Sequence, residues 1–499
     1  MNRREAIRAA ALTGAGLVAG VNPLKASSRG RVASVPPVAG IRERGAQEGE
    51  VLIRGGRVVN HDGSVMSDVR IRGDRIVEIG PGLVPGDRTR VFEAEGHLVM
   101  PGGIDPHAHL QGSFVDDLTS GTAAAVAGGI TAVGTFAYAD PGENAIQAMD
   151  RWLGEAARSA IGDVFFHASS WPPTPEFADM MPDLAARGQP SHKIFMTRGD
   201  FAERRPEVIQ VLEAARDAGV RTLVHCEDGA ILAAALRRLQ ASGRTSLAHY
   251  PESRPIIAEV AATQEAVALL ELTGAPMHFV HLSCARALDA ARTPYTEGLP
   301  LTIETRPLYL YFTEEWLRGP EGPLFIGQPP LRPASDVEAM WDGLRDGRIE
   351  MLATDHAPWT RAQKMDPELN VARLRPGVSD LRWVRPVLFS EGVNKGRLSA
   401  ERFVEVTSTA AARAFGLYPE RGVVREGAIA DVVILDPELE RTADAADDPS
   451  SSDYTPFQGW AIKGWPIVTI RRGQVVFENW RVTAAPGSGR PAARTPWSG

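Results

Sequence analysis

Eight apolar runs with the composition of β-strands recur between about residues 98 and 415 and alternate with helical patterns. The runs read LVMPGGIDPH, GITAVGTFAY, DVFFHASS, HKIFMT, TLVHCE, MHFVHLSC, LTIETR and IEMLATDH. Amphipathic stretches such as NAIQAMDRWLGEAARSA, RPEVIQVLEAARDAG and IIAEVAATQEAVALLELTG lie between several of them. Eight strand–helix units predict an α/β fold of the TIM (β/α)8 type, in which functional groups gather at the carboxyl ends of the strands.

A different pattern flanks this region on both sides. VLIRGGRVVN and DVRIRGDRIVEIG alternate apolar and polar residues around glycines, and so do DVVILDP and IVTIRRGQVVFENW near the other end. Such alternation indicates half-buried antiparallel strands. VLIRGGRVV and VTIRRGQVV read as nearly the same hairpin written twice. We therefore expect one small β-sandwich built from residues 49–97 and 416–485, with the barrel, residues 98–415, inserted between its halves.

The two ends of the chain are expected to lie outside these domains. Arg3 and Arg4 precede an apolar segment from Ala9 to Val21, so residues 1–26 resemble a twin-arginine export signal. This resemblance implies export of the folded protein to the periplasm or another extracytoplasmic space; without export the protein is cytoplasmic. Residues 27–48 read as a linker, and the Pro/Gly/Arg-rich residues 486–499 as a flexible tail.

Charge and cysteine content exclude several classes of protein. The formal net charge is −8 and no basic run occurs, so no nucleic-acid partner is expected. Apart from the export signal, no apolar stretch approaches the ~20 residues of a membrane span. The two cysteines, Cys226 and Cys284, are too few for a disulfide framework or a thiolate cluster, and we expect both to be small buried residues; whether they pair is left open.

Polar residues interrupt the apolar runs near one end of five of them. His107 and His109 end the first run, two positions apart, so they project to the same side of a strand. Four later runs contribute one group each: Lys193, His225, His281 and Asp355. Because strand ends converge on one mouth of a barrel, these six metal-competent groups are expected to meet there.

Each of the six also has an ordinary structural explanation. A single histidine in HFVHLSC is more often a hydrogen-bonded core residue than a ligand, and Asp355 alone could cap a turn. The remaining histidines keep that ordinary explanation. His356 is expected to contact the ligand residues without binding the metal itself. Only the joint placement of the six groups at strand ends favours a metal centre.

Lys193 is the most informative of the six. The chain has five lysines and 49 arginines, yet a lysine stands in the apolar run HKIFM. A buried unpaired ammonium costs several kcal/mol, so this amine either loses its proton or is engaged. A neutral amine can take up CO2 and become a carbamate whose two oxygens can bridge two cations, which a guanidinium cannot do. A lysine that extends to solvent from a strand end is the alternative.

The motifs GIDPHAH, SHKIFM, VHCED, VHLSC and ATDHAP, in this order, resemble the amidohydrolase superfamily, in particular the cyclic amidohydrolases around dihydropyrimidinase and D-hydantoinase. The resemblance continues through EGVNKGRLSAERFVEVTST and SDYTPFQGWAIKGWP to about residue 485. It implies hydrolysis of a C–N bond in a small cyclic amide or ureide, and a homotetramer or homodimer.

The resemblance also implies two divalent metal ions, usually zinc. One ion would be held by His107, His109 and Asp355, and the other by His225 and His281, with carboxylated Lys193 between them. Coordination lowers the pKa of a bridging water from 15.7 to about 7, so that hydroxide can attack the amide carbonyl. Asp355 would take the proton and deliver it to the departing nitrogen.

Three positions differ from the family pattern at residues that bind the substrate. Arg198 stands where a tyrosine usually follows the bridging lysine, Gln328 stands where a serine usually precedes Pro-Pro-Leu-Arg, and Arg373 corresponds to a substrate asparagine. Two arginines could clamp a carboxylate, and Arg198 could also stabilise an oxyanion. We therefore expect a substrate that differs from the usual dihydropyrimidine and carries an anionic group, unless these arginines turn outward.

Two other functions fit the same residues. A dihydroorotase- or allantoinase-like activity would use the same centre on an acidic ring. A non-catalytic hydantoinase-like scaffold would bind partners and hold no metal, although such scaffolds lack ligands that this chain keeps. Metal content separates the scaffold from the enzymes.

Overall fold

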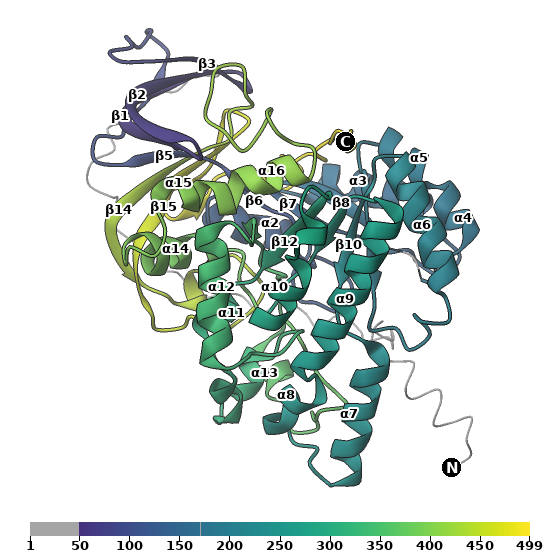
Figure 1. Ribbon diagram of the computed structural model, residues 1–499. Helices are drawn as coiled ribbons and strands as arrows, with labels where there is room; N and C mark the ends of the chain where they lie inside the picture. Colours follow the sequence, from purple (N-terminus) through teal and green to yellow (C-terminus); the bar gives the residue numbers. More distant parts are fainter. Residues whose placement is uncertain (1–48, 170) are drawn as a thin grey trace.

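The computed structural model describes residues 49–169 and 171–499 (Figure 1). The predicted export signal and linker lie outside these residues. In the described part, eight parallel strands form one sheet: β6 (Gly103–Asp105), β7 (Ile130–Ala137), β8 (Asp163–Ser169), β9 (Ser191–Phe195), β10 (Arg221–His225), β11 (Met277–Phe279), β12 (Leu301–Thr305) and β13 (Met351–Leu352). The sheet pairs them in sequence order, which confirms the predicted barrel.

The first and last strands approach each other and nearly close this barrel. Just beyond β6 and β13, Ala108 pairs with His356 in parallel, and the amide of His109 donates to the carbonyl of His356 at 2.7 Å. The amide of Thr354 also donates to the carboxylate of Asp105 at 3.1 Å. The carboxyl ends of β6 and β13 therefore lie side by side.

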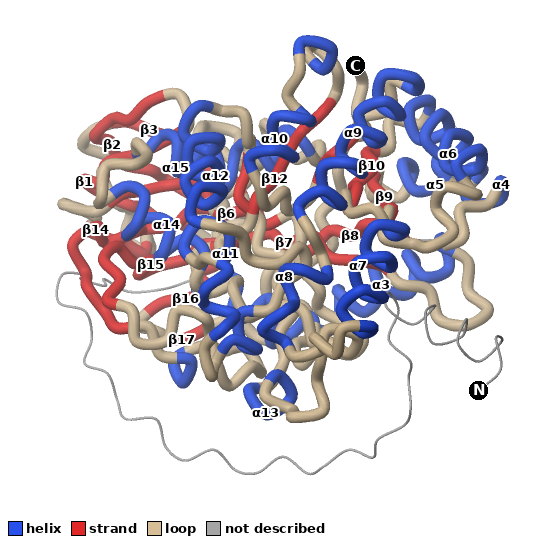
Figure 2. The backbone as a smooth tube through the Cα atoms, turned by 60° about the horizontal axis from the view of Figure 1, so that its bottom comes forward, coloured by secondary structure: helices blue, strands red, loops and turns tan. Residues whose placement is uncertain are grey.

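Helices cover the outside of the barrel strands (Figure 2). The longer ones are α2 (Leu118–Ala127), α3 (Ala145–Ser159), α6 (Arg205–Asp217), α7 (Gly229–Ala241), α9 (Ile256–Thr273) and α12 (Ala334–Asp346). Shorter helices are α4 (Pro175–Asp179), α5 (Met181–Ala186), α8 (Tyr250–Ser253), α10 (Ala285–Ala291), α11 (Leu308–Tyr311), α13 (Arg361–Lys364), α14 (Val384–Leu388), α15 (Ala400–Val404) and α16 (Ala410–Ala414). Local sequence sets their ends: Asn144 and Gln147 form a capping box at the start of α3, and Gly274 ends α9 at φ 64°.

Strands from both ends of the chain form a second, mixed sheet beside the barrel. They are β1 (Glu50–Asn60), β2 (Gly63–Arg72), β3 (Arg75–Gly80), β4 (Arg90–Glu93), β5 (Leu98–Pro101), β14 (Val432–Thr442), β15 (Ala461–Arg471), β16 (Gln474–Glu478) and β17 (Arg481–Val482). β14 pairs antiparallel with β5 and thereby joins the two halves. Figure 1 shows this sheet to one side of the barrel, as expected for a small β-domain split by an insertion.

One predicted hairpin is wrong. VLIRGGRVV does not turn back on itself but runs through as the single strand β1, with a register shift between Ile53 and Gly56. Gly55 adopts φ 68°, and a Cβ on Gly56 would lie 2.5 Å from a methyl group of Val99. The two glycines therefore form a bulge against β5 rather than a turn. The second segment, VTIRRGQVV, does form a hairpin, in which a turn at Arg472 and Gly473 connects β15 to β16.

The first apolar run divides between the two sheets. Leu98–Pro101 pairs with β1 and β14, whereas Gly103–Asp105 pairs with β7, so the predicted boundary at residue 98 moves to Gly102. A side chain on Gly102 would collide with that of Thr131. Glycine therefore allows the chain to pass from one sheet to the other.

The prediction of a flexible tail at residues 486–499 is also wrong. Ala492 donates to the carbonyl of Val164 at 2.7 Å, and the amide of Trp497 donates to Gly219 at 2.8 Å. Arg494 is buried and donates to the carbonyl of Phe166 and the hydroxyl of Ser191, both at 2.8 Å. The tail binds through backbone groups and through the side chain of Arg494, which polar composition alone does not reveal.

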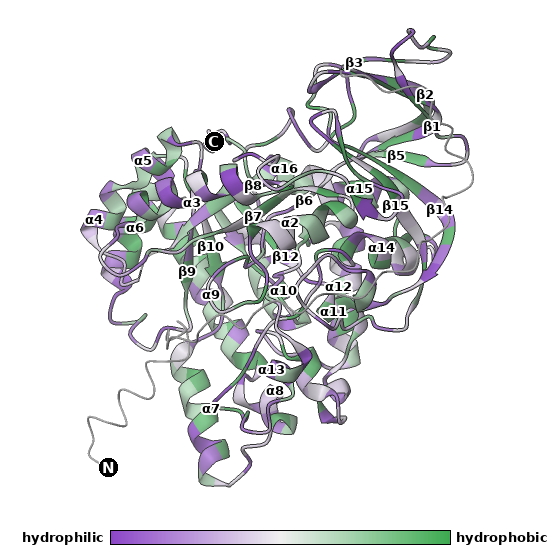
Figure 3. Cartoon of the chain, turned by 180° about the vertical axis from the view of Figure 1, so that it is seen from behind, coloured by the Kyte–Doolittle hydropathy of each residue, from purple (hydrophilic) through white to green (hydrophobic). Residues whose placement is uncertain are grey.

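Apolar side chains fill the barrel and seal its amino-terminal end. Ile104, Phe165, Leu223 and Met351 belong to one buried cluster with Phe415 and with Ala492 of the tail. Hydrophobic colours follow the strands, whereas hydrophilic residues gather on the outer helices and loops (Figure 3). Cys226 and Cys284 are buried and free, as expected for small core residues. None of the helices in residues 49–169 and 171–499 is long and apolar enough to span a membrane.

Deleting residues 486–499 should lower the free energy of unfolding by at least about 2 kcal/mol, because each lost hydrogen bond contributes about 1 kcal/mol. Urea unfolding followed by circular dichroism measures this change. Deletion of Ser498 and Gly499 alone is the control, since the backbone bonds of the tail end at Trp497. Equal stability of the two truncated proteins would contradict the inference that the tail stabilises the amino-terminal end of the barrel.

Candidate metal centre

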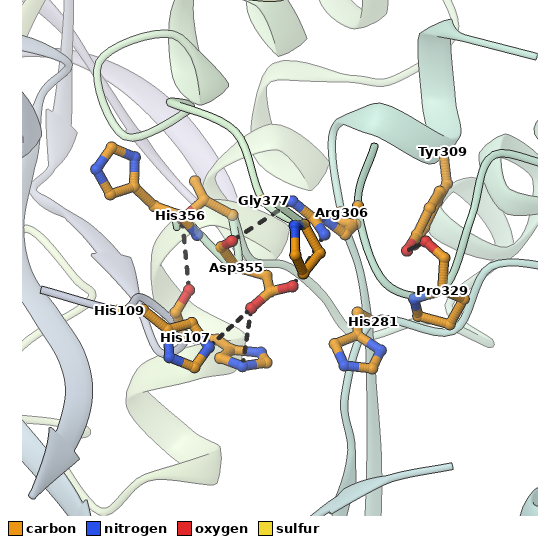
Figure 4. A network of polar contacts seen from close by, with 12 residues as sticks. His107, His109, His281, Arg306, Tyr309, Pro329, Asp355, His356 and Gly377 are labelled. Carbon is orange, nitrogen blue, oxygen red and sulfur yellow. Dashed lines mark hydrogen bonds and ion pairs between the residues drawn. The ribbon is translucent and has the colours of Figure 1, made fainter. Parts of the chain in front are cut away.

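The six side chains expected to meet lie close together, and five of them are at or just beyond the carboxyl ends of their strands. His107 and His109 follow β6, Lys193 lies within β9, and His225 ends β10. His281 follows β11 by two residues, and Asp355 follows β13 by three. Figure 4 shows His107, His109, His281 and Asp355 close together.

His107, His109 and Asp355 form a group whose ligand atoms all lie within 4.8 Å of one another. The Oδ1 atom of Asp355 is 3.1 Å from Nε2 of His109 and 3.3 Å from Nε2 of His107. The two histidines thus face the same side, as their i, i+2 spacing predicts. Imidazole nitrogen with carboxylate oxygen is a donor set that suits Zn²⁺.

Lys193 lies against this group. Its Nζ atom is 3.2 Å from Nε2 of His107, and the side chain is only 1% exposed. The amine also lies over the ring faces of Phe136 and Phe195, 5.3 Å from each centroid. Burial lowers the pKa of Lys193 to about 8, although Asp355 and Glu304 act in the opposite direction.

His225 and His281 form the neighbouring pair. Nδ1 of His225 is 3.0 Å from Nε2 of His281, and the ring of His281 stacks on that of His107 at 5.6 Å between centroids. Burial lowers the pKa of all four histidines. They are therefore neutral at physiological pH, the form that offers a lone pair to a metal.

Partners outside the centre orient three of the four rings, those of His107, His225 and His109. Nδ1 of His107 donates to Glu304 at 2.5 Å, and Nε2 of His225 donates to Glu227 at 2.7 Å. Nδ1 of His109 is 3.3 Å from the hydroxyl of Tyr138. Carboxylates behind imidazole ligands are the usual way to orient metal-binding histidines. The residues present therefore fit a metal centre.

The two carboxylates differ in their electrostatic surroundings. Burial raises the pKa of Glu304 to about 8, with Lys193 opposing the shift. Burial would likewise raise the pKa of Glu227, but Arg254 and His225 outweigh it and hold that pKa at about 2. Glu227 is thus a fixed anion, whereas Glu304 becomes one more readily when a cation occupies the centre.

Two of the six residues have unusual backbone conformations. His281 and Asp355 have φ angles of 44° and 48°, in the left-handed region that non-glycine residues seldom adopt. Strain of this kind persists where the surroundings hold it, and it concentrates at functional sites. It turns both side chains toward the other four.

Arg306 is a charged group at the centre that sequence reasoning missed. It follows β12, is fully buried, and donates from Nη1 to Oδ2 of Asp355 at 2.9 Å (Figure 4). Burial by itself would raise the pKa of Asp355, but Arg306 and His109 outweigh it and lower that pKa. Asp355 therefore stays ionised, with Oδ2 held by Arg306 and Oδ1 turned toward the histidines.

Of the three predicted substrate residues, Arg198 is connected to the centre through Tyr138, which contacts His109. Its guanidinium lies 5.8 Å from the ring centroid of Trp171 and interacts electrostatically first with Asp200 and then with Tyr138. Within residues 49–169 and 171–499, its side chain makes no direct hydrogen bond or ion pair. The guanidinium is thus available to a ligand.

Gln328 and Arg373 lie in different settings. Gln328 follows Gly327, where a Cβ would lie 2.8 Å from Arg306, so its loop borders the centre. Arg373 is exposed in a turn with Asn370, and no direct contact joins it to the six groups in the described part of the chain.

The other histidines near the barrel are structural. His278 contacts Glu304 and Thr302, and His167 contacts Ser191 and the carbonyl of Pro106. His356 contacts Asp116 at 2.8 Å and accepts from the amide of Asp380, so it supports the segment that bears Asp355.

Comparison with known proteins identifies similar sequences and folds. A model described as the amidohydrolase family matches residues 98–476. A D-hydantoinase of Rhizobium radiobacter is 33% identical over 452 residues, covering 88% of this chain and 98% of that protein. A D-phenylhydantoinase of Escherichia coli is 32% identical over 455 residues, covering 90% and 98%.

Solved structures of similar proteins have the same fold as this chain. The dihydropyrimidinase of Brevibacillus agri matches with a TM-score of 0.85 at 30% identity, covering 90% of this chain and 100% of that chain. The D-hydantoinase of a Thermus species matches with a TM-score of 0.86 at 30% identity, covering 90% and 99%.

Glu304→Gln should weaken zinc binding about 10- to 100-fold, because the carboxylate behind His107 no longer raises the basicity of its ring. Competition with a chelating dye measures the dissociation constant. Glu350→Gln is the matched control, since Glu350 accepts from the amide of Ile303, the neighbour of Glu304 on β12, and contacts Arg292. In the described residues it makes no hydrogen bond or ion pair with the four candidate ligand histidines. Equal affinities in the two variants would contradict the assigned role.

Proposed function

The chain belongs to the amidohydrolase family, and on that footing we propose that it opens the rings of cyclic amides or ureides with two divalent metal ions at the barrel mouth. The convergence of six metal-competent groups, with inward-facing lone pairs on neutral histidines, carries the proposal. The names of the relatives, D-hydantoinase and dihydropyrimidinase, support the ring as substrate.

The residues divide naturally between two ions, for which zinc is the best match. His107, His109 and Asp355 would hold one, and His225 and His281 the other. Lys193, in its carboxylated form, would lie between them, which accounts for an amine buried without a carboxylate in direct contact. Such ions lower the pKa of a bound water to about 7 and polarise the amide carbonyl.

Asp355 is the proton carrier in this proposal. Arg306 and His109 lower the pKa of this carboxylate and so keep it ionised, which would let it take a proton from the attacking water. Asp355 would then return the proton to the ring nitrogen as the C–N bond breaks. The ion pair with Arg306 keeps the carboxylate ionised and fixes its direction.

We further propose that the substrate carries an anionic group. Arg198, unpaired in the described structure and beside Tyr138, can donate two parallel hydrogen bonds to a carboxylate at the rim of the centre. Gln328 can both donate and accept toward a ring amide. This arrangement also suits a dihydroorotase- or allantoinase-like reaction, because those rings are acidic.

Lys193→Ala should abolish turnover and the second metal ion together, because the carbamate would be lost from between the two sites. Metal content is measured after reconstitution with zinc and bicarbonate, where about two equivalents are expected for the unaltered chain. Lys395→Ala, at a surface ion pair with Glu391, is the control. Full turnover in Lys193→Ala would contradict the bridging role, and an unaltered chain without metal would favour the scaffold.

Arg198→Met should lower kcat/KM for a carboxylate-bearing cyclic amide by about 10- to 100-fold, since a charge-assisted hydrogen bond contributes about 1.5–3 kcal/mol. Neutral hydantoins should be affected much less. Arg373→Met, in an exposed turn, is the matched control. Fast turnover of unsubstituted dihydrouracil, with no gain from a carboxylate, would contradict the anionic substrate.

A further inference from the structure

A second buried lysine lies behind the proposed site. Lys364 ends the short helix α13 and is only 1% exposed. Among the four lysines that the structure describes, Lys193 and Lys364 are the two that are buried. Lys395 and Lys463 pair with acids at the surface.

The amine of Lys364 is surrounded by main-chain carbonyls rather than acids. Nζ donates to Ile326 at 2.9 Å, to Arg375 at 2.8 Å and to Gly377 at 2.9 Å. Three acceptors match the three N–H groups of an ammonium, whereas a neutral amine has two. Burial and the nearby Arg306 lower the pKa of Lys364 well below its usual range, while Asp380 opposes the shift. The three carbonyl acceptors are a hydrogen-bonding arrangement that favours the charged form. A planar guanidinium could not place three donors in this way.

These carbonyls belong to two loops that are far apart in sequence. One is residues 326–329, which contains Gln328, and the other is residues 375–378. The amide of Gly377 donates to the carbonyl of Ile326 at 2.9 Å, so the loops also contact each other directly. Lys364 therefore lies at the point where the two loops meet.

Each loop is tied in turn to residues of the centre. A Cβ on Gly327 would lie 2.8 Å from Nη1 of Arg306, the atom that holds Asp355. In the other loop, Gly377 has φ 110° and packs so closely on Ala357 that a side chain would collide with its carbonyl. Ala357 donates to the carbonyl of Val378 at 3.1 Å. Figure 4 shows Gly377 beside Arg306 and Asp355.

We propose that Lys364 is a positioning residue, whose ammonium sets the spacing of loops 326–329 and 375–378 and thereby places Gln328 over the substrate. The inference rests on the proposed function for what Gln328 binds, but the clamp itself is a property of the fold. Asp355 keeps its own partners, Arg306 and His109, so loss of the clamp acts mainly on substrate binding.

The test is Lys364→Ala with the missing part of the side chain supplied as n-propylammonium. The variant should exchange amide hydrogens in both loops about tenfold faster, raise KM about tenfold or more, and keep both metals and most of kcat, since small misplacements of binding groups are costly. n-Propylammonium should restore protection and KM, whereas 1-propanol, which lacks the charge, should not. Lys395→Ala should change none of these values.

Unchanged exchange in both loops, or a loss that 1-propanol restores equally well, would overturn the clamp. Because exchange needs no substrate, a failure of the clamp is distinguishable from a failure of the proposed reaction. If Lys364→Ala does not fold, acetylation of the unaltered protein decides. Lys395 and Lys463 should react at least about tenfold faster than Lys364, because its amine is buried, and equal rates would overturn the proposal.

Discussion

Asp355 and the two histidines at 107 and 109 come from opposite ends of the barrel sequence and meet because the first and last strands pair. Ala108 bridges to His356, and the amide of His109 donates to the carbonyl of His356. Ala108 lies between His107 and His109 in the sequence, and His356 follows Asp355 directly. The same backbone contacts that close the barrel therefore set the spacing of the carboxylate and the two imidazoles, and any change in strand register would separate them.

Much of this arrangement is readable from sequence. The eight apolar runs, the alternation with helices and the polar residues at strand ends are local patterns. The structure confirms them, except that the first run divides between the two sheets. Lys193 stands out because an ionisable group in an apolar run needs an explanation. The same reasoning, applied to the run LTIETR, would have identified Glu304. It gives no signal for Lys364, which stands in the polar segment TRAQKMDPE and is buried only through tertiary contacts.

Other features depend on contacts that no local pattern contains. Arg306 reads as an ordinary residue after a strand, and its importance comes from Asp355, 49 positions later. RGG in β1 looks like a turn, but packing against Val99 makes it a bulge. The tail is polar and rich in proline and glycine, yet its backbone bonds to Val164, Gly219 and Gly416 hold it on the barrel.

The position of that tail bears on how the protein is made. Ala492 and Arg494 complete the floor of a barrel whose first strand is synthesised nearly 390 residues earlier, and β14 to β17 complete the other sheet only shortly before. One edge of β5 therefore stays unpaired until β14 has been synthesised. An unpaired strand edge is a template for association with other chains, so the split β-domain lengthens the period in which the protein is prone to aggregate.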